Sequence, residues 1–240
     1  MLKTLKKLTA AAVAVILACT ALTSCGDDDN NPQQSYLYQL VTLDSTSDAG
    51  CKFSFQTGGL ASPVYTLTAA QRVDTTKVKI GERLMIVYTY ANQNISITKP
   101  QSGEVNLHGY QQVLNGKIQY GTSGEFGGFT SHTLMNVYAW VTGPWLNIQA
   151  TGVVKREAKQ FELVMDETAR GEQYPTVYLL FTSDDEIDGV ARTVISSFDM
   201  ESFWNDPANY KGFTLKVANQ NGQHEWTFNR EGVETIKPVS

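Results

Sequence analysis

Apolar and polar residues alternate along most of the chain from Tyr36 onward. A period of two, with many β-branched and aromatic residues, is typical of β-strands that are buried on one face. Before residue 117 this pattern recurs in five or six short segments, with an extended strand ahead of them. The segments are 52–55, 65–69, 78–80, 84–90, 95–97 and 105–107. Strands this short and this closely spaced predict a small OB-like β-barrel over 36–116.

A second series of strands follows after residue 128. The segments are 132–142, 145–154, 160–166, 176–182, 192–198, 213–217 and 224–229. Seven strands separated by turn signals, such as Gly143-Pro144 and Asn221-Gly222, predict an antiparallel β-sandwich over 129–237. The segment 176–182 is almost continuously apolar, so we expect it to be buried on both faces. A short helix is expected within 199–204. The predicted fold class is therefore all-β.

Glycine marks the boundary between the two series. Gly116, Gly121, Gly124, Gly127 and Gly128 fall within 13 residues. Glycine at this density weakens a strand, because it loses much backbone entropy on folding. We therefore predict a Gly-rich linker over 117–128.

The first 24 residues have the layout of a secretory signal peptide. Three lysines precede a 15-residue apolar run, from Leu8 to Leu22. A membrane-spanning helix needs about 20 apolar residues, so this run is too short to span a bilayer and fits the central region of a signal peptide.

The end of this segment resembles the lipobox of bacterial lipoproteins. Leu22-Thr23-Ser24 stands directly before Cys25. The resemblance implies cleavage after Ser24, a diacylglycerol thioether on Cys25, and acylation of the new amino terminus by a chain such as palmitate. Several acyl chains make a lasting membrane anchor. An ordinary signal peptide with a chance cysteine is the alternative.

Residues 25–35 read as an acidic tether. Asp27, Asp28 and Asp29 have no apolar neighbours, so this segment is expected to stay solvated between the lipid and the first domain. An acidic stretch after the lipidated cysteine is similar to the export signal of surface-exposed lipoproteins in the Bacteroidota. It implies display on the outer face of the outer membrane; a periplasm-facing anchor is the alternative.

The net charge and the number of cysteines limit which partners the chain can bind and which thiol chemistry it can carry out. Removal of the signal peptide and its three lysines from a chain of net charge −5 leaves 16 basic and 24 acidic residues, a net charge of −8. A negative chain without a basic stripe argues against nucleic-acid binding. Cys51 would be the one remaining free thiol, and we expect it to be buried at the start of a strand.

The order of these features resembles the NigD-like lipoproteins of the Bacteroidota. The resemblance implies an N-terminal OB-like domain, a C-terminal β-sandwich and no established biochemical activity; the name of the family comes from a bacteriocin-associated operon. Relatives often carry a histidine just before the strand at Phe161, where this chain has Lys159-Gln160. The resemblance rests on the lipobox with its acidic spacer and on five strand patterns: Lys79-Ile80-Gly81-Glu82-Arg83-Leu84, Trp145-Leu146-Asn147-Ile148, Gln160-Phe161-Glu162-Leu163-Val164, Val177-Tyr178-Leu179 and Ser197-Phe198-Asp199.

Motifs for catalysis or metal binding are weak. His108, His132 and His224 do not have the clustered spacing of zinc ligands, and the sequence has no Gly-x-Ser-x-Gly or phosphate-binding loop. The acidic run Asp184–Asp188 mimics the opening of a calcium loop, but Ile195 stands where a bidentate glutamate belongs. A solvated loop is the main interpretation of that run, with a weak calcium site as the alternative. We therefore predict no catalytic residues, no metal site and no cofactor.

Three aromatic residues allow two interpretations. Tyr138, Trp140 and Trp145 lie close in sequence, and exposed aromatic platforms on β-sandwiches bind sugars. Packing in the core or between domains is the expectation we favour.

Three functional hypotheses follow from the sequence. The leading one is a lipid-anchored outer-membrane protein that binds or assembles with a partner, which could be an outer-membrane protein, and that is not an enzyme. The second is a bacteriocin-associated or protective surface protein. The third is a hydrolase whose site is assembled from distant strands.

Overall fold

The computed structural model describes residues 36–92, 99–122, 134–154, 160–182, 190–206, 209–219, 222–232 and 234–237. Several sequence predictions lie outside these ranges: the signal peptide 1–24, the tether 25–35 with Cys25, the segment 95–97, His132, and the acidic run 184–188.

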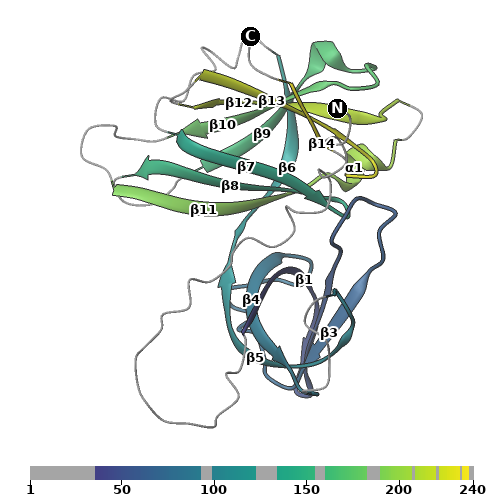
Figure 1. The fold of residues 1–240 in the computed structure, drawn as a ribbon, viewed down its shortest axis with the longest axis vertical. Helices are drawn as coiled ribbons and strands as arrows, with labels where there is room; N and C mark the ends of the chain where they lie inside the picture. The colour runs from purple at the N-terminus through teal and green to yellow at the C-terminus, as the bar shows by residue number, and fades with distance from the viewer. Residues whose placement is uncertain are drawn as a thin grey trace, which may run out of the picture.

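The first five strands form a closed barrel, the lower body in Figure 1. Its strand order is β1-β2-β3-β5-β4, and β4 pairs with β1 to close the ring. All pairs are antiparallel except β3 with β5. The strands are β1 (Leu37–Ser47), β2 (Gly50–Phe55), β3 (Tyr65–Ala69), β4 (Arg83–Tyr90) and β5 (Gly103–Gln112).

The interior of the barrel is filled by the inward residues of these strands. Phe53, Leu67, Leu84 and Ile86 have no solvent-exposed surface. Their neighbours along each strand point outward, as the two-residue period requires. The barrel core therefore comes from the alternation seen in the sequence, and the predicted all-β fold that begins with a small barrel is confirmed.

The remaining strands form one nine-stranded sheet, the upper body in Figure 1. Its order is β14-β13-β12-β10-β9-β6-β11-β8-β7, so β6 lies inside the sheet. The strands are β6 (Leu114–Gly121), β7 (Leu134–Thr142), β8 (Trp145–Val154), β9 (Gln160–Asp166), β10 (Thr176–Thr182), β11 (Val190–Asp199), β12 (Gly212–Asn219), β13 (Gly222–Asn229) and β14 (Glu234–Lys237). A 3₁₀ turn, Glu167–Ala169, follows β9, and the short helix α1 (Glu201–Trp204) follows β11.

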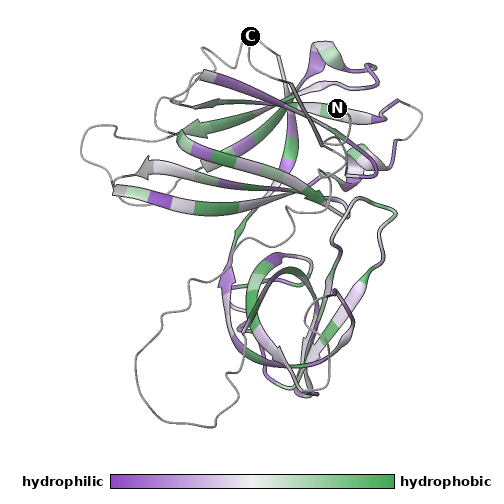
Figure 2. Cartoon of the chain, in the orientation of Figure 1, coloured by the Kyte–Doolittle hydropathy of each residue, from purple (hydrophilic) through white to green (hydrophobic). Residues whose placement is uncertain are grey.

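The sheet folds over on itself around a second core. Buried residues of β7 and β8, such as Leu146, share this core with residues of β10 and β12, such as Phe213. Figure 2 shows the apolar positions on the strands of both units. The two facing layers are those of the expected sandwich, but the pairing differs from the expected antiparallel pattern in three places. β6 is parallel to β9 and to β11, and β10 is parallel to β12.

Two of these three differences have their origin in β6. This strand runs from the barrel directly into the middle of the sheet (Figure 1), so its direction is imposed by the barrel. The predicted linker over 117–128 is wrong for its first part, because residues 117–121 belong to β6. Residues 123–128 lie outside the described ranges.

At Gly116, glycine lets the strand pack closely against an aromatic ring. The ring of Phe198, 2% exposed in the core, lies against the backbone of Gly116, and a Cβ atom there would come within 2.7 Å of that ring. A close approach of this kind is one of the known uses of glycine inside a strand.

Two local predictions are confirmed and one is wrong. The short helix forms as α1, and β12 and β13 form a hairpin in which Asn219 pairs with Gly222. The expectation that 176–182 is buried on both faces is wrong. Val177 and Leu179 are buried, whereas Tyr178 and Leu180 are partly exposed, so β10 covers the core with one face.

Among the described residues, no helix has the length and apolar character that crossing a membrane would require.

Gly116→Ala tests the packing of β6 against Phe198. The added methyl group enters a filled core, so we expect the free energy of unfolding to fall by ~1–3 kcal/mol. Gly109→Ala is the matched control, because a Cβ atom at Gly109 in β5 meets open space. Thermal or urea unfolding measures both variants, and equal stability of the two would contradict this packing.

Candidate functional site

The barrel meets the sheet at Arg83, the first residue of β4. Its side chain is 2% exposed and lies on the outside of the barrel, between the two units. Its guanidinium donates to Thr42 Oγ1 of the barrel at 3.4 Å and to Thr142 Oγ1 of the sheet at 3.2 Å. The guanidinium carbon also lies 5.5 Å from the centre of the Trp145 ring, within cation–π range. A single side chain therefore contacts both units.

Buried polar side chains extend the junction into the sheet. Thr142 Oγ1 also accepts from Asn147 Nδ2 at 2.8 Å, and Asn147 Oδ1 accepts from Ser197 Oγ at 2.8 Å. Each of these residues is no more than 9% exposed. The network therefore links β7, β8 and β11 to the first residue of β4.

No described carboxylate pairs with Arg83. Burial lowers the pKa of the Arg83 guanidinium to about 9, because desolvation is not offset by a negative charge. The group still carries its charge at pH 7, and its Nε has no hydrogen-bond partner. The junction thus encloses a buried cation whose partners are hydroxyl groups and an aromatic ring.

Asn115 supports the same junction from the chain that joins the two units. Its Oδ1 accepts from the backbone N–H of Arg83 at 2.8 Å, and its Nδ2 donates to the Arg83 carbonyl at 3.2 Å. One side-chain amide therefore makes both backbone contacts that a neighbouring strand would make to Arg83. Nδ2 also donates to the Val113 carbonyl at 3.0 Å, at the point where β5 ends and β6 begins.

A second contact lies in the loop between β2 and β3. Gly143 donates its backbone N–H to Gly58 O at 2.7 Å, and Leu60 donates to Arg230 O at 3.0 Å. The Leu60 side chain also packs against the core of the sheet. Contacts at two separate places restrain rotation of the barrel relative to the sheet.

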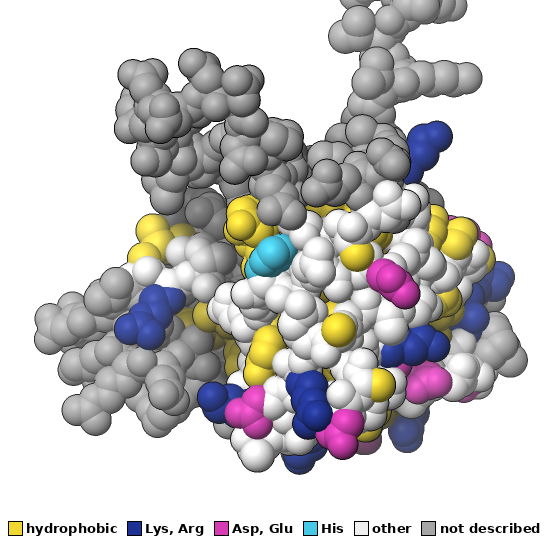
Figure 3. Space-filling model, turned by 90° about the horizontal axis from the view of Figure 1, so that it is seen from below, with side chains coloured by type: hydrophobic (Ala, Val, Ile, Leu, Met, Phe, Trp, Pro, Cys, Tyr) yellow, Lys and Arg dark blue, Asp and Glu magenta, His cyan; other side chains and the backbone are white. Residues whose placement is uncertain are grey.

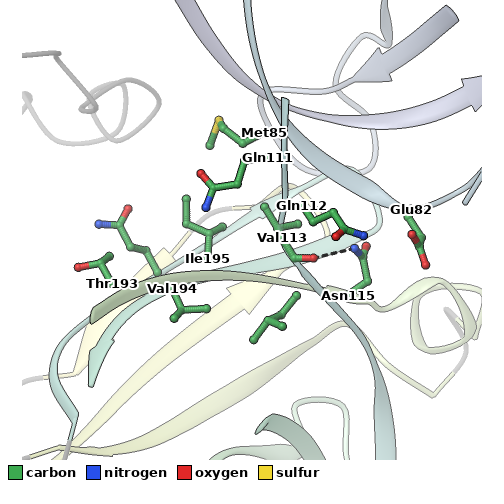
Figure 4. A pocket seen from close by; sticks show the side chains of 11 residues that line it. Glu82, Met85, Gln111, Gln112, Val113, Asn115, Thr193, Val194 and Ile195 are labelled. Atoms are coloured by element: carbon green, nitrogen blue, oxygen red, sulfur yellow. Dashed lines mark hydrogen bonds between the residues drawn. The ribbon is translucent and has the colours of Figure 1, made fainter. Parts of the chain in front are cut away.

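A cavity of about 570 Å³ opens beside the junction, between the barrel and the sheet. We call it the junction groove. In Figure 4, Met85 and Gln111 of the barrel lie across from Thr193 and Ile195 of β11. The lining residues are Glu82, Met85, Gln111, Gln112, Val113, Leu114, Asn115, Gln149, Thr193, Val194 and Ile195.

The lining of the groove combines amides with apolar side chains. Glu82 is its single charged residue, and one carboxylate oxygen of Glu82 already accepts the backbone N–H of Lys79 at 2.9 Å. Amide groups both donate and accept hydrogen bonds. A concave site of this size with a few polar groups is the usual form of a ligand site, and the lining here suits an uncharged ligand.

The histidines that the structure describes are not brought together. His108 on the barrel makes a 3.0 Å hydrogen bond with Thr89 and an edge contact with Tyr36. His224 on β13 stacks on Trp226. Across the described ranges, no three His, Cys, Asp or Glu side chains gather as metal ligands would.

Charges are mixed on the end of the barrel. Figure 3 shows this face, where basic and acidic side chains are interspersed. Such a surface differs from the continuous basic surfaces that neutralise phosphates in nucleic-acid complexes.

The three aromatic residues take different positions, and Trp140 on β7 is partly buried. Trp145 packs at the junction beside Arg83, so the expectation of packing between domains is confirmed for Trp145. Tyr138 lies on the outer face of β7 and is 61% exposed, so the expectation of core packing is wrong for that residue. In the sheet, Tyr138 pairs with Gln149, which lines the groove.

Cys51 is buried at the start of β2, as expected. Its thiol is 3% exposed and donates to the Gln71 carbonyl at 3.0 Å. Burial raises the pKa of the Cys51 thiol from 9.0 to about 11, because desolvation disfavours the thiolate.

Sequence reasoning did not identify the junction. Arg83 appears in the sequence only as the entry to an apolar strand, and Asn115 only as a polar residue beside a glycine. The available signal was an arginine at the head of a strand that is otherwise apolar. It does not reveal the partner elements, which are more than 30 residues away.

Solved structures similar to this chain include proteins of Bacteroides species. A protein of unknown function (DUF1344) from Bacteroides vulgatus aligns with a TM-score of 0.60 and 16% identity, over 86% of this chain and 92% of that chain. A candidate lipoprotein from Bacteroides fragilis aligns with a TM-score of 0.51 and 11% identity, over 85% of this chain and 96% of that one.

The family expected from the sequence is also among the similar structures. A NigD-like immunity protein from Bacteroides caccae aligns with a TM-score of 0.48 and 14% identity, over 87% of this chain and 94% of that one. No family model and no curated protein matches the sequence. At these identities the likeness shows the fold alone.

Arg83→Met and Arg83→Lys separate the roles of volume and charge. Methionine keeps most of the buried volume and removes the cost of the unpaired charge, so we expect stability within ~1 kcal/mol of the native chain. Lysine also carries a buried charge, but its ammonium group is more strongly hydrated than a guanidinium and lacks the planar set of N–H donors. We therefore expect the free energy of unfolding to fall by ~2–3 kcal/mol. Urea unfolding measures both variants. The reverse order would show that the charge itself stabilises the junction.

The reactivity of Cys51 tests the burial of its thiol. In a mature chain carrying Cys25→Ser, we expect disulfide reagents at pH 8 to modify the folded protein ~100-fold more slowly than the unfolded protein, because a pKa higher by two units leaves that much less thiolate. The raised pKa also stabilises the fold below about pH 9, and this contribution is lost as pH rises through about 11. Equal rates in the folded and unfolded chain would contradict the burial.

Proposed function

We propose that this chain is a lipid-anchored protein of the bacterial envelope that binds a partner in the junction groove and is not an enzyme. The observation that carries this proposal is the groove itself. Its walls come from two units joined at Arg83 and at the β2–β3 loop, so the cavity exists before any ligand arrives. A pre-formed site loses less conformational freedom on binding.

Binding accounts for the groups in the groove better than catalysis does. The amides of Gln111 and Gln149 can hold a ligand through hydrogen bonds, whereas the amides of Gln112 and Asn115 are bonded within the protein. General acid–base chemistry requires titratable groups placed at the reacting atoms. The described lining supplies one carboxylate, Glu82, and that group is already engaged by a backbone N–H.

The sequence supports the anchor. A basic start, an apolar run and Cys25 after Leu22-Thr23-Ser24 form the lipobox-like segment. A fold shared with the candidate lipoprotein from Bacteroides fragilis agrees with an anchored protein. The acidic tether favours the outer face of the outer membrane, where the groove would meet partners outside the cell.

Cys25→Ala tests the anchor. We expect cells expressing the native chain to incorporate labelled palmitate into the protein and to retain it in the outer-membrane fraction. Cys25→Ala should abolish both, because the thioether cannot form. Cys19→Ala is the matched control: Cys19 lies within the apolar run, so label and membrane retention should persist.

The same cells test the binding role. The anchored chain is solubilised from native envelopes and its co-purifying proteins are quantified. A stoichiometric partner captured by the native chain and by Cys19→Ala supports the proposal. Unlabelled, soluble native chain would overturn the anchor, and native envelopes without a bound partner would overturn the binding role.

A further inference from the structure

One strand of the sheet is paired along only part of one edge. β11 pairs with β8 at ten consecutive positions, from Val190 to Asp199. On its other side it pairs with β6 at four positions, from Ser196 to Asp199. Among the described residues, therefore, the edge of β11 over 190–195 has no neighbouring strand.

The barrel is the cause of this open edge. β6 is parallel to β11, and an upstream extension of β6 would continue alongside 190–195. The residues before Leu114 do not continue alongside β11, because they belong to β5 and pair with β4 in the barrel. The hydrogen bonds of Asn115 to Arg83 and Val113 stabilise the chain where β5 passes into β6.

The junction groove lies along this open edge. Thr193, Val194 and Ile195 all line it. Side chains of consecutive strand residues point to opposite faces, so a cavity that touches three in a row lies beside the backbone. Five further lining residues are consecutive in the chain, from Gln111 to Asn115.

We propose that the junction groove binds an extended, uncharged polypeptide segment of a partner protein, which adds to β11 as a further strand. This inference rests on the proposed binding function and names its ligand class. Exposed N–H and C=O groups along a strand edge are complementary to another extended backbone. The open edge spans six residues, about 20 Å at ~3.3 Å per residue.

The side chains around the edge favour the same ligand. Thr193, Val194 and Ile195 have high β propensity, and Arg192, the one charged residue within 190–195, is exposed and does not line the groove. The single lining carboxylate, Glu82, disfavours an acidic segment. Gln111 and Gln149 also line the groove, and their amides can hydrogen-bond polar groups of the incoming strand.

The test begins with a library of displayed peptides of about ten residues, long enough to cover the ~20 Å edge, selected against the purified chain. An enriched peptide is then added to the isotope-labelled protein, and amide hydrogen exchange is measured residue by residue. We expect exchange to slow at least tenfold within 190–195. A neutral oligosaccharide is the comparison ligand.

Two variants complete the design. Ile195→Lys places a charge in the groove and should weaken peptide binding at least tenfold. Asn136→Lys is the matched control, because Asn136 is exposed on β7 away from the groove, and it should bind as the native chain does. The proposal is overturned if no peptide is enriched, if protection appears elsewhere, such as at the edge of β7, or if the oligosaccharide binds and peptides do not.

Failure of strand addition can be distinguished from failure of the proposed binding function. An envelope partner that is captured equally by the native chain and by Ile195→Lys would overturn strand addition at β11 and leave the anchored binding role standing.

Discussion

The arrangement of this molecule depends on a buried arginine that has no described carboxylate beside it. Arg83 carries its charge between the barrel and the sheet, where two threonine hydroxyls and the ring of Trp145 take the place of a counterion. A charge in such a position is expensive unless its geometry is well satisfied. The two units therefore pack in the arrangement that brings Thr42 and Thr142 to the same guanidinium.

The groove follows from the same constraint. The side chain of Asn115 hydrogen-bonds the backbone N–H and C=O of Arg83, in the place of a neighbouring strand. At this point β5 leaves for the barrel and β6 enters the sheet. Because β6 joins β11 only from Ser196 onward, the edge of β11 over 190–195 opens into the cavity. The junction thus determines both the placement of the barrel and the length of β11 that has no strand beside it among the described residues.

Periodicity in the sequence predicted the strands well and the connections poorly. The segments 65–69 and 160–166 coincide with β3 and β9, because half-buried strands leave a two-residue signature. The linker expected over 117–128 is wrong for residues 117–121, because glycine density does not distinguish a loop from a strand held against an aromatic ring, as at Gly116. The junction could not be predicted, since it depends on contacts between residues such as Arg83 and Thr142, which are distant in sequence.

The most direct test of this account asks whether the barrel and the sheet form one rigid body in solution. Residual dipolar couplings of the backbone amides would be fitted separately for residues 36–112 and for 114–237, within the described ranges. We predict that both units give the same alignment tensor in magnitude, rhombicity and orientation. Two different tensors would show that the units move independently, and would contradict a groove that is formed before its ligand binds.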